Sequence, residues 1–136
     1  AAANATWLTD SKGFTFSGAG FSATLQDWTR FGLLVANEGA LNGMQIVSKA
    51  WIDETSKHGP SDQASRFNVA RPGRGYRNFF WHHSADGRML RMAGAMSQNM
   101  LIDKKTKTVL VQTGVSDESG AEEMMSALFA SACDQS

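Results

Sequence analysis

The chain has 136 residues, of which 42% are apolar, and a chain of this kind buries roughly two thirds of its unfolded surface, so we expect residues 1–136 to form a single domain. Its formal net charge of zero argues against a nucleic-acid partner, and its single cysteine, Cys133, excludes an internal disulfide and a cysteine metal cluster. No apolar run approaches the roughly 18 residues of a transmembrane helix, so we expect a soluble protein, cytoplasmic or periplasmic, with no membrane partner.

The first regular element predicted along the chain is a helix that begins after Thr24. The preceding segment, Trp7 to Gly20, is rich in glycine, serine and threonine and is typical of an irregular connection. Thr24 and Asp27 form a capping box, and Asn37 to Gly39 ends the helix. Its apolar residues at helical spacing, among which Trp28 and Leu34 are expected to be buried, are Leu25, Trp28, Phe31, Leu34 and Val35.

A shorter helix is predicted from Ser48 to about Lys57. Ser48 is the expected N-cap, and the segment His58-Gly59-Pro60 ends the helix. Its apolar surface comes from Ala50, Trp51 and Ile52. The next segment, Ser61 to Arg77, is polar and interrupted by Pro72, Gly73 and Gly75, so we expect a long loop there, either functional or mobile.

The spacing of apolar residues then changes to the period of two that is typical of strands. Asp86-Gly87 predicts a hairpin between Phe79 to His83 and Met89 to Met92. The polar segment Asp103 to Thr106 predicts a second hairpin between Met96 to Ile102 and Thr108 to Thr113. Three to four antiparallel strands are therefore expected.

A closing helix is predicted from about Gly120, with Ser119 and Glu122 as a capping box. Its expected buried stripe consists of Met124, Met125, Leu128, Phe129 and Ala132. The predicted fold class is α+β: an antiparallel sheet of three to four strands, with N-terminal helices and a C-terminal helix packed on it.

Several segments resemble conserved runs of the β-lactamase-like serine hydrolases. Gly20 to Gly32 resembles the run G-x-x-A-T-x-x-D-x-A-R-F-G, and Gly43 to Trp51 resembles a downstream segment that ends in tryptophan. Phe80-Trp81 is similar to a Y-G-[yf]-x-W strand, and Met92 to Asp103 is similar to a G-x-x-G-Q strand pair. These segments keep the family's order and cover nearly the whole chain. The resemblance is to the C-terminal part of enzymes such as class C β-lactamases, carboxylesterases and 6-aminohexanoate-dimer hydrolases, so the chain is expected to be a fragment of such a fold.

The resemblance implies acyl transfer through a serine in a Ser-x-x-Lys motif, assisted by a Tyr-x-Asn motif. No serine of this sequence stands three residues before a lysine, so we expect no nucleophile in this chain. The only tyrosine, Tyr76, begins Tyr76-Arg77-Asn78, which matches Tyr-x-Asn in form but lies later than the family's order places that motif. Tyr76 is therefore either a substrate-binding residue or an aromatic anchor of the loop.

A third family motif, a lysine or histidine followed by one residue and a glycine, aligns with Ala95-Met96-Ser97 through the neighbouring Gln98. The resemblance makes these four residues candidates for substrate binding. Ala95 lacks the cationic donor that recognises a carboxylate, so β-lactam specificity is not expected. The backbone N–H of Gln98 is a candidate oxyanion-hole donor. If the segment were a strand, replacing Ser97 by glycine would cost up to about 1 kcal/mol.

For the remaining histidines and charged residues, the sequence favours structural roles. His82 and His83 are adjacent on a predicted strand and point to opposite faces, so no metal site is expected, and no cofactor is implied. The acidic residues Asp10, Asp27, Asp53 and Glu54 stand at helix caps or on helix faces. The arginine cluster could pair with an acidic substrate or partner, although a solvated loop also accounts for it; it comprises Arg66, Arg71, Arg74 and Arg77.

Two functional hypotheses follow. In the first, the chain is the C-terminal portion of a Ser-x-x-Lys hydrolase that acts on a small ester or amide, and a missing N-terminal portion or companion chain carries the nucleophile. In the second, the chain is a noncatalytic binding or self-associating module derived from that fold. An uncovered sheet edge and apolar helix face would then favour a homo-oligomer.

Overall fold

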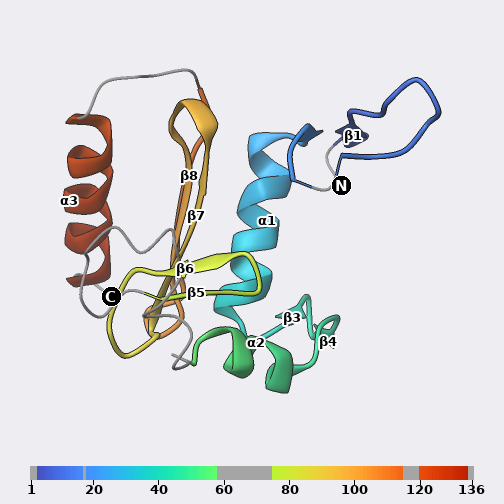
Figure 1. Cartoon of the computed structure of the whole chain (residues 1–136). Coiled ribbons are helices and arrows are strands. Elements are labelled where there is room, and N and C mark those ends of the chain that lie inside the picture. The colour runs from blue at the N-terminus through green and yellow to red at the C-terminus, as the bar shows by residue number, and fades with distance from the viewer. Residues whose placement is uncertain (1–2, 17, 58–74, 115–119, 135–136) are drawn as a thin grey trace.

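A computed structural model describes residues 3–16, 18–57, 75–114 and 120–134. The α+β class is confirmed: a five-stranded antiparallel sheet lies between helix α3 on one face and helix α1 on the other (Figure 1). The helices are α1 (Leu25–Ala36), α2 (Lys49–Thr55) and α3 (Gly120–Asp134). The 3-10 segment η2 (Ala95–Ser97) lies between two strands of the sheet.

The sheet has the order β5-β6-β7-β8-β9, each strand antiparallel to its neighbours. Its strands are β5 (Tyr76–Arg77), β6 (Phe80–His82), β7 (Met89–Gly94), β8 (Gln98–Asp103) and β9 (Thr108–Gln112). Both predicted hairpins are present. The prediction of three to four strands omitted β5, which is only two residues long and lies in the segment assigned to the long loop. Most of that segment, residues 61–74, lies outside the described residues.

Two apolar cores form because successive strand residues point to opposite faces. On one face, Leu90, Met100 and Ile102 pack with Val35 and Ala36 of α1 and with Ile52 of α2. On the other face, Leu101 packs with three residues of α3, namely Met125, Phe129 and Cys133. The alternation along β8 therefore fixes which helix covers which face.

Helix α1 begins as its sequence predicts. The Asp27 backbone N–H donates to Thr24 Oγ1 (3.1 Å), and the Thr24 hydroxyl donates to Asp27 Oδ2 (2.9 Å). Trp28 and Leu34 are only half-buried, because the residues of α1 that enter the core are Gly32, Val35 and Ala36. The helix also ends within the predicted region, just before Asn37 to Gly39. Gly39 has φ +88°, and a Cβ at this position would lie 2.0 Å from the Val47 carbonyl oxygen, so glycine is required there.

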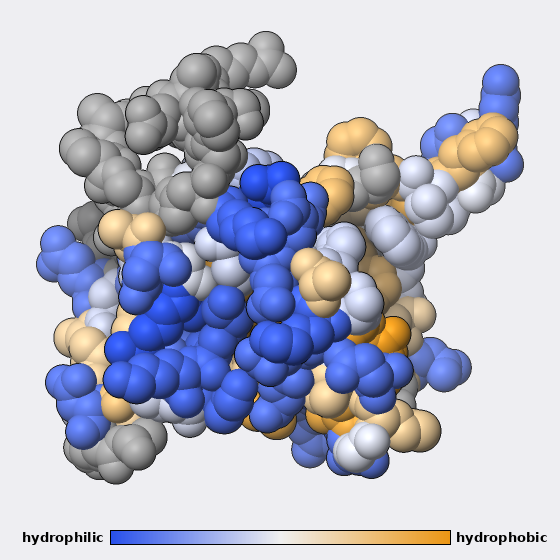
Figure 2. Space-filling model, turned by 90° about the horizontal axis from the view of Figure 1, so that it is seen from below, coloured by the Kyte–Doolittle hydropathy of each residue, from blue (hydrophilic) through white to orange (hydrophobic). Residues whose placement is uncertain are grey.

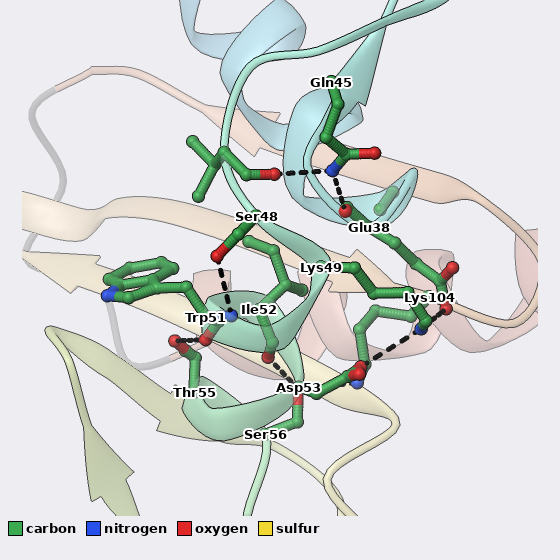
Figure 3. A network of polar contacts seen from close by, with 12 residues as sticks. Glu38, Gln45, Ser48, Lys49, Trp51, Ile52, Asp53, Thr55, Ser56 and Lys104 are labelled. Atoms are coloured by element: carbon green, nitrogen blue, oxygen red, sulfur yellow. Dashed lines mark hydrogen bonds and ion pairs between the residues drawn. The ribbon is translucent and has the colours of Figure 1, made fainter.

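Helix α2 is capped by Ser48, whose Oγ accepts from the Trp51 N–H (3.3 Å), and it ends at Thr55, earlier than predicted. Of its predicted apolar surface only Ile52 is buried, whereas Trp51 is 43% exposed. Figure 3 shows the polar contacts that surround α2, in which Lys49 links Glu38 to Asp53. Two short ribbons flank α1, formed by β1 (Thr6–Trp7) with β2 (Phe21–Ser22) and by β3 (Ala40–Leu41) with β4 (Met44–Gln45). The first of them lies partly in the segment predicted to be irregular.

Helix α3 differs from its prediction in the face that it buries. Met125 and Phe129 are buried as expected, but Met124 and Leu128 are 59% and 56% exposed, and Cys133 takes the third buried position in place of Ala132. Ser119 lies outside the described residues, as does the side chain of Glu122, so the predicted capping box is not described. No helix in the described ranges has the length and apolar character needed to cross a membrane.

Candidate active-site turn

The segment Ala95 to Gln98 is the turn of the β7–β8 hairpin. The Gln98 N–H donates to the Ala95 carbonyl oxygen, and the two residues between them, Met96 and Ser97, have φ of 57° and 63°. Two successive positive φ values are those of a type I′ turn, in which Asn-Gly is the preferred pair. The strand that was expected from Met96 therefore begins only at Gln98. The glycine of the family motif aligns with Ser97, whose backbone lies in the left-handed region.

This turn presents apolar and uncharged atoms to solvent. Met96 is 64% exposed, and Ala95 is also exposed. The Gln98 side chain fixes the turn to the end of β9, because its amide nitrogen donates to the Gly114 carbonyl oxygen and its Oε1 accepts from the Gly114 N–H (3.3 Å). The turn is thus held in place at Gln98, whereas the side chain of Met96 is exposed to solvent.

The Gln98 backbone N–H, the candidate oxyanion-hole donor, is engaged inside this turn by the Ala95 carbonyl oxygen. Donation to a substrate oxyanion would require this bond to lengthen or to be shared. The geometry therefore makes any such role depend on a change in the turn.

Tyr76 lies away from this turn. The sheet register places Tyr76, Trp81 and Arg91 in one row, and Ala95 follows Arg91 by four residues, or roughly 13 Å along an extended strand. Tyr76 instead packs on Trp81, with ring centroids 4.6 Å apart, while the Asn78 amide donates to Thr55 Oγ1 (3.1 Å). These contacts are those of an anchor between β5 and its neighbours.

The residues of the run Gly20 to Gly32, which resembles a family segment, have structural roles in this chain. Gly20 has φ +80°, and a Cβ there would lie 2.7 Å from Leu8 Cβ. Arg30 pairs with Asp27 of the capping box (2.7 Å), and Phe31 stacks on Phe80 with centroids 6.4 Å apart. A Cβ on Gly32 would lie 2.5 Å from Val109 Cγ1, so glycine permits the close approach of α1 to β9.

The most strongly perturbed carboxylate, Asp103, was not singled out from the sequence. Asp103 is fully buried and accepts two hydrogen bonds from the Arg88 guanidinium, one of them at 2.8 Å. Burial alone would raise the pKa of Asp103, but the bonds from Arg88, the Lys105 N–H, Cys133 and Thr106 outweigh it and hold the pKa well below its usual range. Burial raises the pKa of the neighbouring Cys133 thiol. The signal that the sequence offered was the position of Asp103 at the end of an apolar run. The pairing with Arg88 follows from the hairpin register, in which Asp103 lies opposite Met89.

Lys104 and Ser56 form a second pair that sequence reasoning missed. Lys104 Nζ donates to Ser56 Oγ (2.5 Å), and Ser56 Oγ donates to the Ile52 carbonyl oxygen (3.0 Å). Burial lowers the pKa of Lys104. The serine hydroxyl hydrogen is directed to a backbone oxygen of α2, so Ser56 accepts from Lys104 and does not donate to it. The bond from Lys104 therefore ties the end of α2 to the β8–β9 turn. This end of the sheet, opposite the Ala95 to Gln98 turn, belongs to a largely hydrophilic surface (Figure 2).

The remaining candidates are held in structural contacts. His82 is buried, with Nε2 2.8 Å from the Thr55 carbonyl oxygen. Arg77 pairs with Glu54, whereas the rest of the arginine cluster, Arg66, Arg71 and Arg74, lies outside the described residues. Within the described part of the chain, no three histidine, cysteine, aspartate or glutamate side chains are grouped so that they could hold a metal ion.

Comparison with known proteins confirms the resemblance, since the chain is similar in sequence and in fold to part of β-lactamase-like serine hydrolases. The curated 6-aminohexanoate-dimer hydrolase of Paenarthrobacter ureafaciens is 28% identical over 113 residues, which are 80% of this chain and 28% of that protein. A solved structure named "Putative 6-aminohexanoate-dimer hydrolase from Bacillus anthracis" aligns with a TM-score of 0.71 and 27% identity, over 95% of this chain and 34% of that one. The chain thus spans about a third of the length of these relatives. No family model matches.

Proposed function

We propose that this chain is a portion of a Ser-x-x-Lys serine hydrolase that acts on esters or amides by acyl transfer and is incomplete by itself. The observation that carries the proposal is the similarity to 6-aminohexanoate-dimer hydrolases in both sequence and fold. Because the sequence contains no Ser-x-x-Lys motif, we assign the nucleophile of the proposed enzyme to another portion or to a companion chain. In such an assembly the serine oxygen attacks the substrate carbonyl while the lysine takes the serine proton, and the ester C–O or amide C–N bond then breaks as that proton passes to the departing alcohol or amine. Water later attacks the acyl-serine, which releases the carboxylic acid and restores the serine hydroxyl.

The proposed contribution of this chain is one wall of the substrate site, formed by the turn from Ala95 to Gln98. Its apolar, uncharged side chains, with Met96 foremost, favour a substrate that is uncharged where it meets the turn. A carboxylate at that point would lose its hydration without gaining a cationic partner. Simple esters and linear amides are therefore preferred to carboxylate-bearing β-lactams.

A serine-reactive phosphonate tests the missing nucleophile. We expect the purified chain to remain unlabelled by intact-mass analysis, because no serine of the sequence belongs to a Ser-x-x-Lys motif. Ser56, which lies beside Lys104, already directs its hydroxyl hydrogen to the Ile52 carbonyl oxygen. Stoichiometric labelling of this chain would contradict the proposal.

The proposed wall is tested by complementation with a Ser-x-x-Lys portion of a relative. Turnover of an activated ester is measured for the original chain and for Ala95→His/Ser97→Gly, each with and without that portion. We expect turnover only with the portion present, and faster turnover with the double substitution, which adds a donor. If the original chain alone turned over the ester as fast as the complemented double variant, the claim that this chain lacks the nucleophile would be wrong. The alignment through Gln98 would be wrong as well.

A further inference from the structure

The end of the β7–β8 hairpin projects beyond the strands on either side of it. The pairing of β6 with β7 ends at Arg91, and Figure 1 shows the hairpin extending past β5 and β6. On the other side, the last backbone pair between β8 and β9 joins Asn99 to Gln112. In the described part of the chain, the turn from Ala95 to Gln98 therefore lies beyond the last strand pair on both sides.

The side chain of Gln98 supplies a contact that the backbone lacks here. Its Oε1 accepts from the Gly114 N–H (3.3 Å) and its Nε2 donates to the Gly114 carbonyl oxygen, so one carboxamide bonds both backbone groups of a residue, as a neighbouring strand would. Nε2 also donates to the Met96 carbonyl oxygen (3.3 Å). Gly94, opposite Gln98 in the register, leaves room for this side chain, because a Cβ on Gly94 would lie 3.2 Å from Gln98 Cβ.

The sequence of the turn does not by itself favour the turn conformation. Met96 and Ser97 both have positive φ, a region that is costly for L residues, and neither is the asparagine or glycine that this turn type prefers. Such a conformation persists only where surrounding contacts compensate for its cost. The carboxamide of Gln98 provides these contacts, because it bonds to Met96 inside the turn and to Gly114 outside it.

We propose that the Gln98 side chain is a positioning residue, which holds Met96 in the substrate wall and so maintains the preference for substrates that are uncharged at this point. This inference rests on the proposed function and adds the residue that sets its substrate preference. While the turn is closed, a carboxylate beside Met96 loses water and gains no cationic partner. Without the carboxamide the turn opens, water reaches the carboxylate, and the penalty against it falls.

Hydrogen exchange of the chain alone, followed by NMR, tests the first step. Gln98→Met keeps the length of the side chain but removes the carboxamide, so we expect the protection of the backbone N–H at position 98, which donates to the Ala95 carbonyl oxygen, to fall about tenfold. Gln112→Met makes the same change at the end of β9 and should leave this protection unchanged. Ser97→Gly added to Gln98→Met should restore it, because glycine adopts positive φ without cost. Protection that survives Gln98→Met, or that Ser97→Gly does not restore, would overturn the proposal.

A specificity ratio tests the second step. With the chain complemented by the Ser-x-x-Lys portion of a relative, kcat/KM is measured for two activated esters that differ only in a carboxylate on the acyl group. The ratio of the two values does not depend on how much of the chain is folded, so a purely structural effect leaves it unchanged. We expect Gln98→Met to lower the preference for the neutral ester by at least about fivefold, and Ser97→Gly to restore it in that chain. Gln112→Met should keep the original ratio.

The two measurements separate this inference from the proposed function. A specificity ratio that stays unchanged in Gln98→Met, although the turn has lost its protection, would overturn the positioning role. If no complemented sample turned over either ester, the proposed function itself would be wrong, and the role of Gln98 in substrate preference would be wrong with it. The exchange experiment would still show whether the carboxamide holds the turn.

Discussion

Lys107 Nζ donates to the carbonyl oxygen of Ala36 at 2.7 Å and so joins the β8–β9 turn to the last residue of α1. The two residues are 71 positions apart in the sequence. The bond satisfies one of the carbonyl groups left without a partner at a helix end, and the ammonium charge also favours the negative end of the helix dipole. Lys104 acts similarly at the end of α2 through Ser56, so one turn holds the ends of two helices.

Lys107→Met should lower the free energy of unfolding by about 0.5–1 kcal/mol, because it removes a charge-assisted bond at a helix end from a largely exposed side chain. Urea unfolding followed by circular dichroism measures the change. Lys105→Met is the matched control, since Lys105 is exposed in the same turn and lacks the contact to α1. Equal losses in the two variants would show that the Ala36 bond contributes nothing.

Gly32→Ala should destabilise the chain by about 1 kcal/mol net. The added Cβ would lie 2.5 Å from Val109 Cγ1 and 3.1 Å from Met100 Sδ, and overpacking of this kind costs about 1–3 kcal/mol, partly offset by the higher helix propensity of alanine. Gly120→Ala is the control, because nothing lies within 4 Å of a Cβ at that position. An increase in the melting temperature of Gly32→Ala would contradict the close approach of α1 to β9.

The elements that the sequence predicted well are those whose signals are local. Thr24 with Asp27 and Ser48 with Trp51 are contacts within one helical turn, and the segment Asp86-Gly87 is a turn signal by itself. The family runs could be matched because they are contiguous in the chain. Such signals place the start of a helix or a hairpin without knowledge of the tertiary structure.

What the sequence did not predict depends on contacts between distant segments. Helical spacing allows either Met124 or Met125 to face the core, and only the position of α3 over Leu101 selects Met125. The pairing of Asp103 with Arg88 requires the register of the β7–β8 hairpin. Met96-Ser97 is not a turn sequence, so the turn at the candidate site was assigned to a strand.

Ser97→Gly should raise the free energy of unfolding by about 1 kcal/mol, because Ser97 has φ +63° and a left-handed conformation costs an L residue about 1–2 kcal/mol. This sign is opposite to the cost expected for glycine in a strand. Ser97→Ala is the matched control, since it removes the hydroxyl but keeps the Cβ and should bring no gain. If glycine destabilises the chain in urea unfolding, Ser97 does not adopt this turn conformation.

Asp103→Asn should cost about 3 kcal/mol of stability at neutral pH, because it leaves the Arg88 guanidinium without its charged partner beside a buried site. The sign of the pH dependence follows from the depressed pKa of Asp103. Its contribution is fully present above the unfolded pKa of about 4 and is lost as the pH falls toward the lower folded pKa. The difference in melting temperature between the original chain and Asp103→Asn should therefore be constant from neutral pH to about pH 5 and should narrow below about pH 4. Asp10→Asn, at an exposed turn, is measured in parallel as a control for the removal of a carboxylate elsewhere in the chain. If the difference in melting temperature between the original chain and Asp103→Asn stays unchanged below about pH 4, the lost stability comes from packing and not from the ionised carboxylate.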